Sequence, residues 1–270
     1  MIPARSIQFF ARKREEMQTY VIKPIVLSKV NSEKGPMTYL TYHGVPVVRP
    51  YVMWYIGGAS RNILVDTAIE AEDYRNSHPC FNKHPFEALQ SFEEGLSTVG
   101  CEPDDIEIVI QTHLHLDHVY NAAKCRNAEV YVQKKELEFA LNPHPIFEVF
   151  FPGEIIRKLQ FQTVDGDCEI LPGIELLSAP GHTPGCQAVA VQTEKGKAVI
   201  TGCCTTLDNF TPPEDAKTAI SPFATYPIIA PGIHTDLFAA YESAVRIKQL
   251  ADIIIPMHDP LMASKERIPW

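Results

Sequence analysis

The sequence of 270 residues lacks the features that mark membrane, exported and nucleic-acid-binding proteins. Nowhere do about 18 apolar residues follow one another, which is the length that a membrane-spanning helix needs. The amino end mixes basic and acidic side chains and contains no apolar segment as long as that of an export signal. Lysine and arginine form no large cluster, and a formal net charge of −9 disfavours phosphate binding. We therefore expect a cytoplasmic protein with no membrane and no nucleic-acid partner.

The seven cysteines also lack the paired spacing of a disulfide framework. Most should be reduced thiols, and Cys101, Cys125 and Cys168 are predicted to be inert core residues. Hydrophobic residues make up 45% of the chain, which is enough for a sizeable core. The length suits one large α/β domain or two small ones.

Strand and helix patterns succeed one another twice along the chain. The first half alternates β-rich runs with turn residues, and the second half returns to a strand, turn, strand pattern. Two sheet-rich halves, each followed by helices, predict a single α/β domain over residues 1–270, built as a four-layer αββα sandwich. The expected strands are 20–27, 37–42, 47–56, 62–66, 106–110, 129–133, 174–178, 187–192, 198–201 and 251–255, and the expected helices are 85–96, 134–141 and 236–250.

The most informative stretch reads Gln-Thr-His-Leu-His-Leu-Asp-His at residues 111 to 118. Neutral imidazole and carboxylate are the usual ligands of zinc-like ions. His113 and His115 are two residues apart at a strand end and point the same way, while Asp117 and His118 lie where the chain bends toward a helix. The stretch predicts a metal site with capacity for two adjacent ions. The alternative is a polar strand end with solvated histidines.

Two further histidines lie at the ends of predicted strands. His182 is presented by the loop Ala179-Pro-Gly-His-Thr-Pro-Gly185, whose glycines and prolines fix a tight turn. His258 follows the short buried run 251–255. A single loop histidine is more often a surface residue than a ligand. His182 and His258 therefore indicate a metal site only in combination with the stretch 111–118.

The order of these motifs resembles that of the metallo-β-lactamase superfamily, with further marks at Val65-Asp66-Thr67 and Thr201-Gly202. The resemblance runs from about Tyr20 to His258 and implies an αββα sandwich with its site on the sheet edges. It implies that Asp66 supports the histidine loop from a buried position, and a strand-terminal turn is the alternative. The implied ligands are His113, His115 and His182 for a first metal, and Asp117, His118 and His258 for a second.

The aspartate that bridges the two metals in most of these proteins has no counterpart here. Counting from the strand side places Cys203 at its position, whereas counting back from 209–210 places Gly202 there. Thiolate is a good zinc ligand, and one β-lactamase subclass of the superfamily uses a cysteine here for the second metal. Three alternatives stay open: Cys203 binds the second metal, Cys203 is no ligand and one site is weak, or a single metal binds. Cys204 is predicted to lie on the opposite strand face, in the core.

Segments 38–39, 50–55, 103–112 and 209–210 are most similar to the N-acyl homoserine lactone lactonase branch, whose activity is quorum quenching. That similarity implies a hydrolase in which metal-bound hydroxide opens a lactone or a related cyclic ester or amide. One or two Zn²⁺ ions are expected, with iron or manganese as alternatives. An iron-dependent thiol or persulfide oxidoreductase of the same superfamily is the alternative function, and a non-catalytic small-molecule binder is another.

Asp117 is the predicted catalytic residue, because a carboxylate beside the nucleophile can receive and pass on its proton. Segment 210–232 contains five prolines and is expected to form a long loop near the active site. Tyr226 and His234, in or next to this loop, are candidates to contact a small-molecule substrate, with a purely local loop role as the alternative. A homodimer is a further expectation, because the aromatic-rich segment 51–55 suits an interface or a pocket wall.

Overall fold

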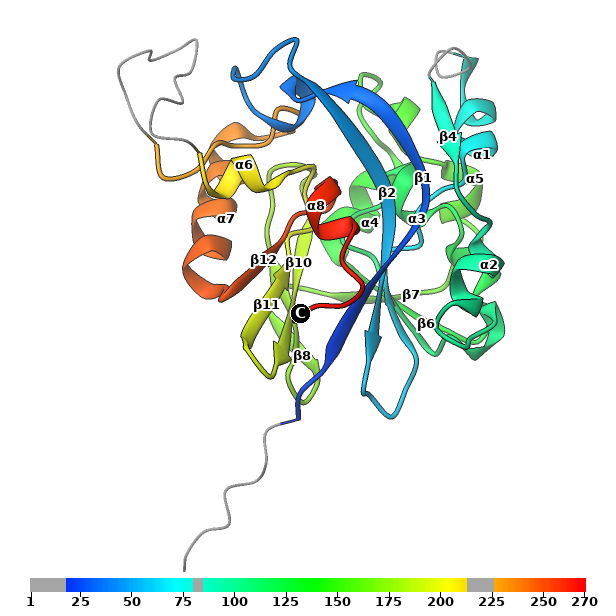
Figure 1. Ribbon diagram of the computed structural model, residues 1–270. Coiled ribbons are helices and arrows are strands. Elements are labelled where there is room, and N and C mark those ends of the chain that lie inside the picture. The colour runs from blue at the N-terminus through cyan, green and yellow to red at the C-terminus, as the bar shows by residue number, and fades with distance from the viewer. Residues whose placement is uncertain (1–17, 80–84, 213–225) are drawn as a thin grey trace, which may run out of the picture.

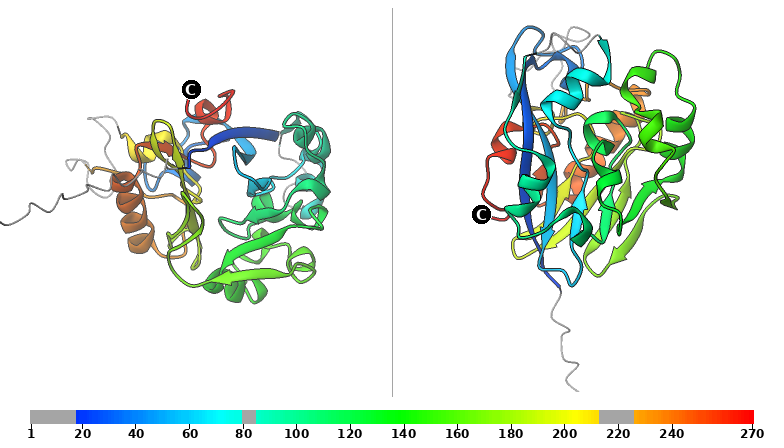
Figure 2. Two further views of the ribbon diagram at one scale, coloured as in Figure 1. Left: turned by 90° about the horizontal axis from the view of Figure 1, so that it is seen from below. Right: turned by 90° about the vertical axis from the view of Figure 1, so that its right-hand side faces the viewer.

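The structure is a computed structural model that describes residues 18–79, 85–212 and 226–270. Two β-sheets face each other at its centre, and helices cover their outer faces (Figure 1). Seen from below, the order of layers is α7 (Leu237–Leu250), the smaller sheet, the larger sheet and the remaining helix layer (Figure 2). This arrangement confirms the predicted αββα sandwich.

The larger sheet has seven strands in the order β4-β1-β2-β3-β5-β6-β7. Its first part is antiparallel, since β1 pairs with β4 and β2, and β2 pairs with β3. From β3 to β7 the neighbouring strands are parallel. The bounds are β1 Val21–Glu33, β2 Pro46–Gly57, β3 Ile63–Val65, β4 Phe86–Ala88, β5 Ile108–Ile110, β6 Glu129–Gln133 and β7 Phe161–Val164.

The smaller sheet has five strands in the order β12-β11-β10-β9-β8. Its pairs are antiparallel except for β11 and β12, which run parallel. Among the described residues, no helix is long and apolar enough to cross a membrane. The strand bounds are β8 Cys168–Leu171, β9 Ile174–Ser178, β10 Gln187–Thr193, β11 Gly196–Ile200 and β12 Ile253–Ile255; the other helices are α1 Ala71–Ser77, α2 Phe92–Ser97, α3 Leu116–Val119, α4 Lys134–Leu141, α5 Gly153–Ile156, α6 Leu207–Phe210 and α8 Pro260–Ala263.

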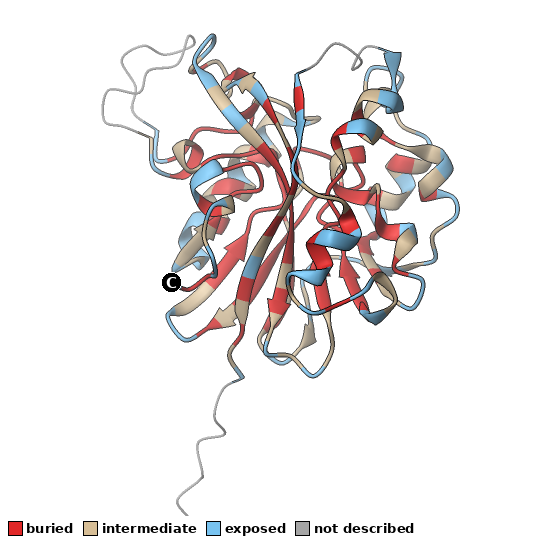
Figure 3. Ribbon diagram, turned by 45° about the vertical axis from the view of Figure 1, so that its right-hand side comes forward, coloured by how far each residue is buried: buried red, intermediate tan, exposed pale blue. Residues whose placement is uncertain are grey.

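The apolar side chains divide between the space that separates the sheets and the space beneath the helices. In β3, Ile63 and Val65 belong to the core between the sheets, whereas Leu64 packs in the cluster that contains Phe92 of α2. Burial on both faces is why this central strand reads as an unbroken apolar run. Figure 3 shows the result: buried residues follow the strands, and exposed residues lie on the outer surface of the helices.

The predicted strand 37–42 is wrong. The chain forms a short 3-10 helix, Gly35–Met37, and then turns through left-handed backbone at Leu40 (φ 51°) and Tyr42 (φ 55°). The Thr38 hydroxyl donates to the carbonyls of Lys34 and Thr41, at 2.9 and 2.8 Å. Side-chain hydrogen bonds of this kind compete with regular strand pairing, and residue-type propensity does not register them.

The predicted helix 85–96 is half right. Its first part is β4, which pairs with β1, and the helix begins only after Ser91. Ser91 and Glu94 form a capping box, which fixes that start point. Strands β7 and β8 had no predicted counterpart, because they are short and carry polar residues on their open faces. Of the predicted loop 210–232, residues 213–225 lie outside the described part of the chain.

Candidate metal centre

The six histidine and aspartate ligands predicted from the sequence come from separate segments and meet at one end of the strands. His113 and His115 follow β5, Asp117 and His118 lie in α3 directly beyond, and single histidines follow β9 and β12. The rings of His113 and His118 are 3.9 Å apart between centroids, so the two sets adjoin. The ligand atoms form two groups whose members all lie within 4.8 Å of one another: His113, His115 and His182, and Asp117, His118 and His258.

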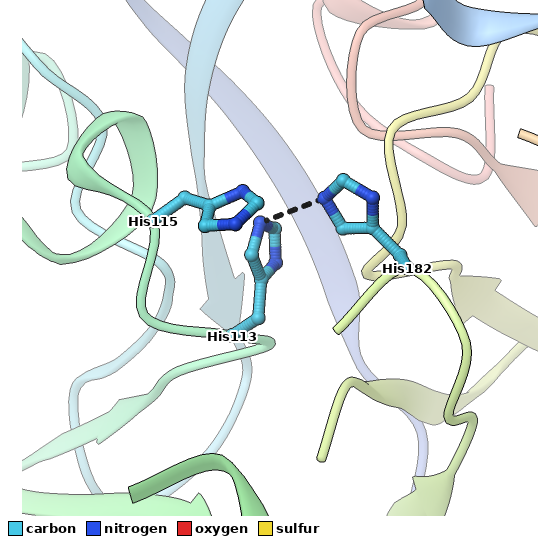
Figure 4. A group of neighbouring side chains, drawn as sticks. All are labelled: His113, His115 and His182. Atoms are coloured by element: carbon cyan, nitrogen blue, oxygen red, sulfur yellow. Dashed lines mark hydrogen bonds between the residues drawn. The ribbon is translucent and has the colours of Figure 1, made fainter. Parts of the chain in front are cut away.

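In the first group, the imidazoles present lone pairs to one another. The Nδ1 atom of His182 donates to the carbonyl of Ile233 at 2.7 Å, which leaves its Nε2 as an acceptor. Nε2 of His182 is 3.2 Å from Nε2 of His113 (Figure 4). Nε2 of His115 is buried and has no hydrogen-bond partner.

Thr112 fixes the tautomer of His113. The Thr112 hydroxyl donates to Asp66 at 2.7 Å and therefore accepts from Nδ1 of His113 at 3.1 Å. The Nε2 atoms of His113 and His182 are then both acceptors at hydrogen-bond distance, an arrangement that is repulsive without a cation between them. A divalent metal ion bound between these atoms would remove the repulsion and would give Nε2 of His115 a partner. The first group therefore fits a metal ion.

The second group is built around Asp117. Its Oδ2 atom lies 3.6 Å from Nε2 of His118 and 3.6 Å from Nε2 of His258. The other nitrogen of each ring is occupied, since Nδ1 of His258 donates to the carbonyl of Pro50 at 3.0 Å and Nδ1 of His118 lies 2.7 Å from Asp66. A carboxylate and two oriented imidazoles suit a second divalent ion.

Asp66 supports both groups from beneath, as the sequence predicted. It is fully buried at the end of β3 with a left-handed backbone (φ 57°). Its carboxylate accepts from the backbone amide and the hydroxyl of Thr112 and binds the ring of His118. These contacts fix both the path of the histidine loop and the orientation of one of its rings.

Glu136, which the sequence analysis did not single out, ties the two histidine loops together. Its buried carboxylate accepts from the amide of Leu114 at 2.9 Å, and from the hydroxyl of Thr183 at 2.6 Å and the amide of Gly185 at 3.1 Å. A Cβ atom at Gly185 would lie 2.1 Å from the backbone nitrogen of Glu136, so glycine alone allows this approach. The flanking Gly-x-x-x-Gly loop was the only available signal, because the partner lies 49 residues away.

Burial keeps four of the histidines neutral and therefore able to bind metal. Loss of solvation, together with the neighbouring imidazoles, holds the pKa values of His113 and His115 well below the usual range. Burial lowers the pKa of His182 to about 4 and that of His258 to about 3. The lone pairs of these rings are thus available at neutral pH.

Asp117 and His118 form an ion pair instead. Burial opposes the charge of Asp117, but His118 and His258 outweigh it and hold the pKa of this carboxyl below its usual range. Burial likewise opposes the charge of His118, yet Asp117 and Asp66 together raise its pKa. Asp117 is therefore ionised at neutral pH and can bind a cation.

Cys203, the seventh predicted ligand, belongs to neither group. Its Sγ atom lies 3.9 Å from the hydroxyl of Thr205, and it is Cys204 that lines the cavity beside Asp117. The predicted strand alternation is wrong here because β11 ends at Ile200 and Gly202 turns the chain (φ 73°). A Cβ atom at Gly202 would lie 1.9 Å from the carbonyl oxygen of Gln187. The backbone therefore has no room for an aspartate at that alternative position.

The substrate contacts predicted from the proline-rich segment lie apart from the cavity. Tyr226 is 38% exposed, and His234 bonds to the carbonyl of Pro231 at 2.9 Å and packs edge-on against Tyr39. Within the described residues, neither lines the cavity of about 210 Å³ that both metal groups face. Its other walls include Arg49, Tyr74, Phe86, Phe150 and Ile233.

The fold and the paired ligand groups define a metal-binding protein of the metallo-β-lactamase type. The sequence pattern of that superfamily matches residues 46–258, so the chain belongs to the superfamily. An N-acyl homoserine lactonase of Bacillus thuringiensis is 37% identical over 105 residues, which are 39% of this chain and 40% of the relative. AttM, an N-acyl homoserine lactonase of Rhizobium radiobacter, is 31% identical over 123 residues, with 41% and 45% covered. The chain thus spans less than half the length of these curated relatives.

Solved structures agree over a longer stretch. A variant of AiiA from B. thuringiensis, with N-decanoyl-L-homoserine bound at its active site, matches with a TM-score of 0.70 and 26% identity, covering 91% of this chain and 95% of that one. AidC, a dizinc quorum-quenching lactonase, matches with a TM-score of 0.62 at 18% identity, covering 92% and 90%, and shares the fold alone. These likenesses confirm the similarity to the lactonase branch.

We predict that metal-free protein loses stability as the pH falls from about 6.5 toward 4. Unfolded histidines bind protons below pH 6.5, whereas His182 and His258 stay neutral until the pH reaches about 4 and about 3. Protons therefore favour the unfolded chain in this window, and the raised pKa of His118 opposes this only in part. Urea unfolding in the presence of a chelator measures the effect. A free energy of unfolding that is constant from pH 7 to 4 would contradict it.

We predict that Glu136→Gln destabilises the fold by about 1–3 kcal/mol, because an amide nitrogen then faces donors in a buried site. The two histidine loops should also separate and bind zinc more weakly. Glu138→Gln is the matched control, since Glu138 is exposed in the same helix. Urea unfolding and chelator competition for zinc measure the two effects. Equal behaviour of both variants would show that Glu136 does not hold the loops.

Proposed function

We propose that this chain is a metal-dependent hydrolase that opens lactones or related cyclic esters and amides. The observation that carries the proposal is the pair of adjacent ligand groups facing one cavity, with four of their five imidazoles held neutral by burial. The structural similarity to a lactonase over 91% of the chain, and the sequence similarity to another over 39% of it, support the same chemistry. The relatives compared above are hydrolases, so the hydrolytic alternative is favoured over an iron-dependent oxidoreductase.

The residues of the two groups have distinct tasks in such a reaction. A divalent metal ion held there would lower the pKa of a bound water to about 7 and would polarise the carbonyl of an ester. His113, His115 and His182 would hold the first ion, and His118 and His258 would hold the second together with Asp117. Asp117 is ionised and can accept a proton at Oδ2, which makes it the proposed catalytic residue.

The two ions should differ in affinity. The first group offers three buried imidazoles, two of which already present lone pairs to each other, whereas the second offers one carboxylate and two imidazoles. Zinc suits both donor sets, and iron and manganese are the alternatives for the oxygen-containing one. Of the alternatives for Cys203, we favour the one in which it is not a ligand and one site is weak, because it lies outside both groups.

We predict that removing metal abolishes turnover of a lactone panel and that replacing His115 by alanine strongly reduces it. His115 supplies the buried Nε2 atom that has no other partner, so its loss should lower kcat/KM by about a hundredfold or more. His43→Ala is the control, since His43 is exposed. Steady-state assays on zinc-reconstituted proteins measure the effect. Unchanged turnover in His115→Ala would refute a metal-dependent mechanism.

We predict that zinc binds metal-free protein in two steps of unequal affinity. Asp117→Asn should remove the weaker step and leave the tighter one, because the carboxylate belongs to the second group alone. Calorimetric titration with zinc, checked by metal analysis after dialysis, measures both steps. Binding of a single equivalent to the wild type would instead support the one-metal alternative.

A further inference from the structure

One charged side chain in the cavity has no part in the proposed metal chemistry. Arg49 projects from β2 and lines the same cavity as Asp117, His118, His258 and Cys204. A guanidinium is charged at every pH at which proteins fold, so the cavity holds a permanent cation next to the second ligand group.

The contacts of Arg49 position it but do not neutralise it. One terminal nitrogen donates to the hydroxyl of Tyr51 at 2.7 Å, and the guanidinium lies 5.3 Å from the centroid of the Tyr51 ring. Nε is buried and has no acceptor. No carboxylate of the described chain lies within 4.0 Å of this guanidinium, although Asp117 is close enough to act on it through space. The Cys204 side chain also hydrogen-bonds to this guanidinium. A guanidinium has five N–H donors, so several remain available to a ligand.

The charges around Arg49 favour an anion from outside the protein. A partly buried cation without a counterion is costly, and both the Tyr51 hydroxyl and the Cys204 thiol are neutral partners. The ligand groups contribute one carboxylate, Asp117, with Asp66 behind them, and Gly202 leaves no room for another. One or two divalent ions would add further positive charge. An anionic ligand would lower the electrostatic energy of this cavity more than a neutral one would.

We propose that Arg49 is a specificity-determining residue that binds a carboxylate carried by the substrate close to its scissile bond. The preferred substrates are then lactones with an acidic substituent on or next to the ring. This inference rests on the proposed lactone hydrolysis and names the substrate class for it. The Tyr51 hydroxyl holds the planar guanidinium so that its remaining donors can bind a carboxylate with two parallel hydrogen bonds.

A matched pair of substrates tests the proposal: γ-butyrolactone bearing a γ-carboxylate and the same lactone bearing a γ-carboxamide. The wild type should prefer the carboxylate, and Arg49→Met should lower kcat/KM for it by about tenfold to a hundredfold while changing the carboxamide little. Arg49→Lys keeps the positive charge but cannot form two parallel hydrogen bonds, so its kcat/KM for the carboxylate lactone should lie between those of the wild type and Arg49→Met. Arg126→Met, at an exposed arginine, is the control for the loss of one positive charge.

Equal losses on both lactones would overturn the proposal, because Arg49 would then act on the carboxylate that ring opening creates or on the reacting ester itself. A binding experiment gives a readout that needs no turnover. Calorimetry compares tetrahydrofuran carboxylate with its carboxamide, neither of which contains an ester, on zinc-loaded wild type and Arg49→Met. The preference for the carboxylate should fall by about tenfold or more in the variant. An unchanged preference would mean that the metal ions alone bind the anion.

The two experiments separate this inference from the proposed function. If the wild type hydrolyses no lactone, the proposed function fails, and the calorimetric ratio still decides what Arg49 binds. If both lactones are hydrolysed equally well, hydrolysis stands and the assignment of Arg49 fails. Circular dichroism and thermal unfolding of Arg49→Met and Arg49→Lys check that any loss is not a loss of fold.

Discussion

The metal centre depends on the hydrogen bonds that four of its histidines make at Nδ1, the ring nitrogen that faces away from the ligand groups. Nδ1 of His182 and of His258 donates to a backbone carbonyl, and Nδ1 of His113 and of His118 is fixed through Thr112 and Asp66. Each bond selects one tautomer and one ring orientation, so that the opposite nitrogens converge as acceptors. The convergence is unfavourable for the isolated protein and favourable for a protein that holds a cation. The supporting hydrogen bonds therefore preorganise the site for metal binding.

Two buried carboxylates outside the cavity maintain this arrangement across the sheets. Asp66 ends a strand of the larger sheet and fixes the loop that carries three histidines. Glu136 lies in α4. Its carboxylate binds both the loop that carries His113 and the loop that carries His182, which follows a strand of the smaller sheet. The bonds of Asp66 stay within the half that contains the larger sheet, whereas those of Glu136 reach both halves, so movement of one sheet against the other would break the Glu136 bonds. The two halves of the sandwich thus share one centre.

The sequence predicted the features that depend on residue type and local spacing. The strand ends and the pair spacing of His113 and His115 indicated a metal site, and the resemblance to the superfamily supplied the division of six ligands into two groups. The helix at 134–141 was placed at its observed bounds. It failed where a tertiary contact decides the outcome. The side-chain bonds of Thr38 turn a β-rich segment into a turn, and Glu136 meets its partners only in the folded chain.

The same distinction explains the cysteine pair. Extending the strand alternation beyond β11 put Cys203 toward the metals, but Gly202 reverses the chain, so that Cys204 reaches the cavity instead. The periodicity of the sequence does not predict this turn, because the turn accompanies the close approach of Gly202 to Gln187 on the neighbouring strand. Backbone packing therefore leaves no room for an aspartate at Gly202, and cysteines occupy the next two positions.

The absence of a bridging carboxylate and the presence of Arg49 in the cavity wall have the same electrostatic effect. A bridging aspartate would offset part of the charge of two divalent ions, and its loss leaves that charge to be balanced by whatever enters the cavity. Arg49 shifts the balance in the same direction from the wall of the cavity. Each of these two features alone would weaken binding of the second metal ion, but they are consistent with each other if the substrate itself brings the negative charge. On this argument the centre is completed electrostatically only when an anionic substrate is bound, and selectivity and metal affinity are set by the same few groups.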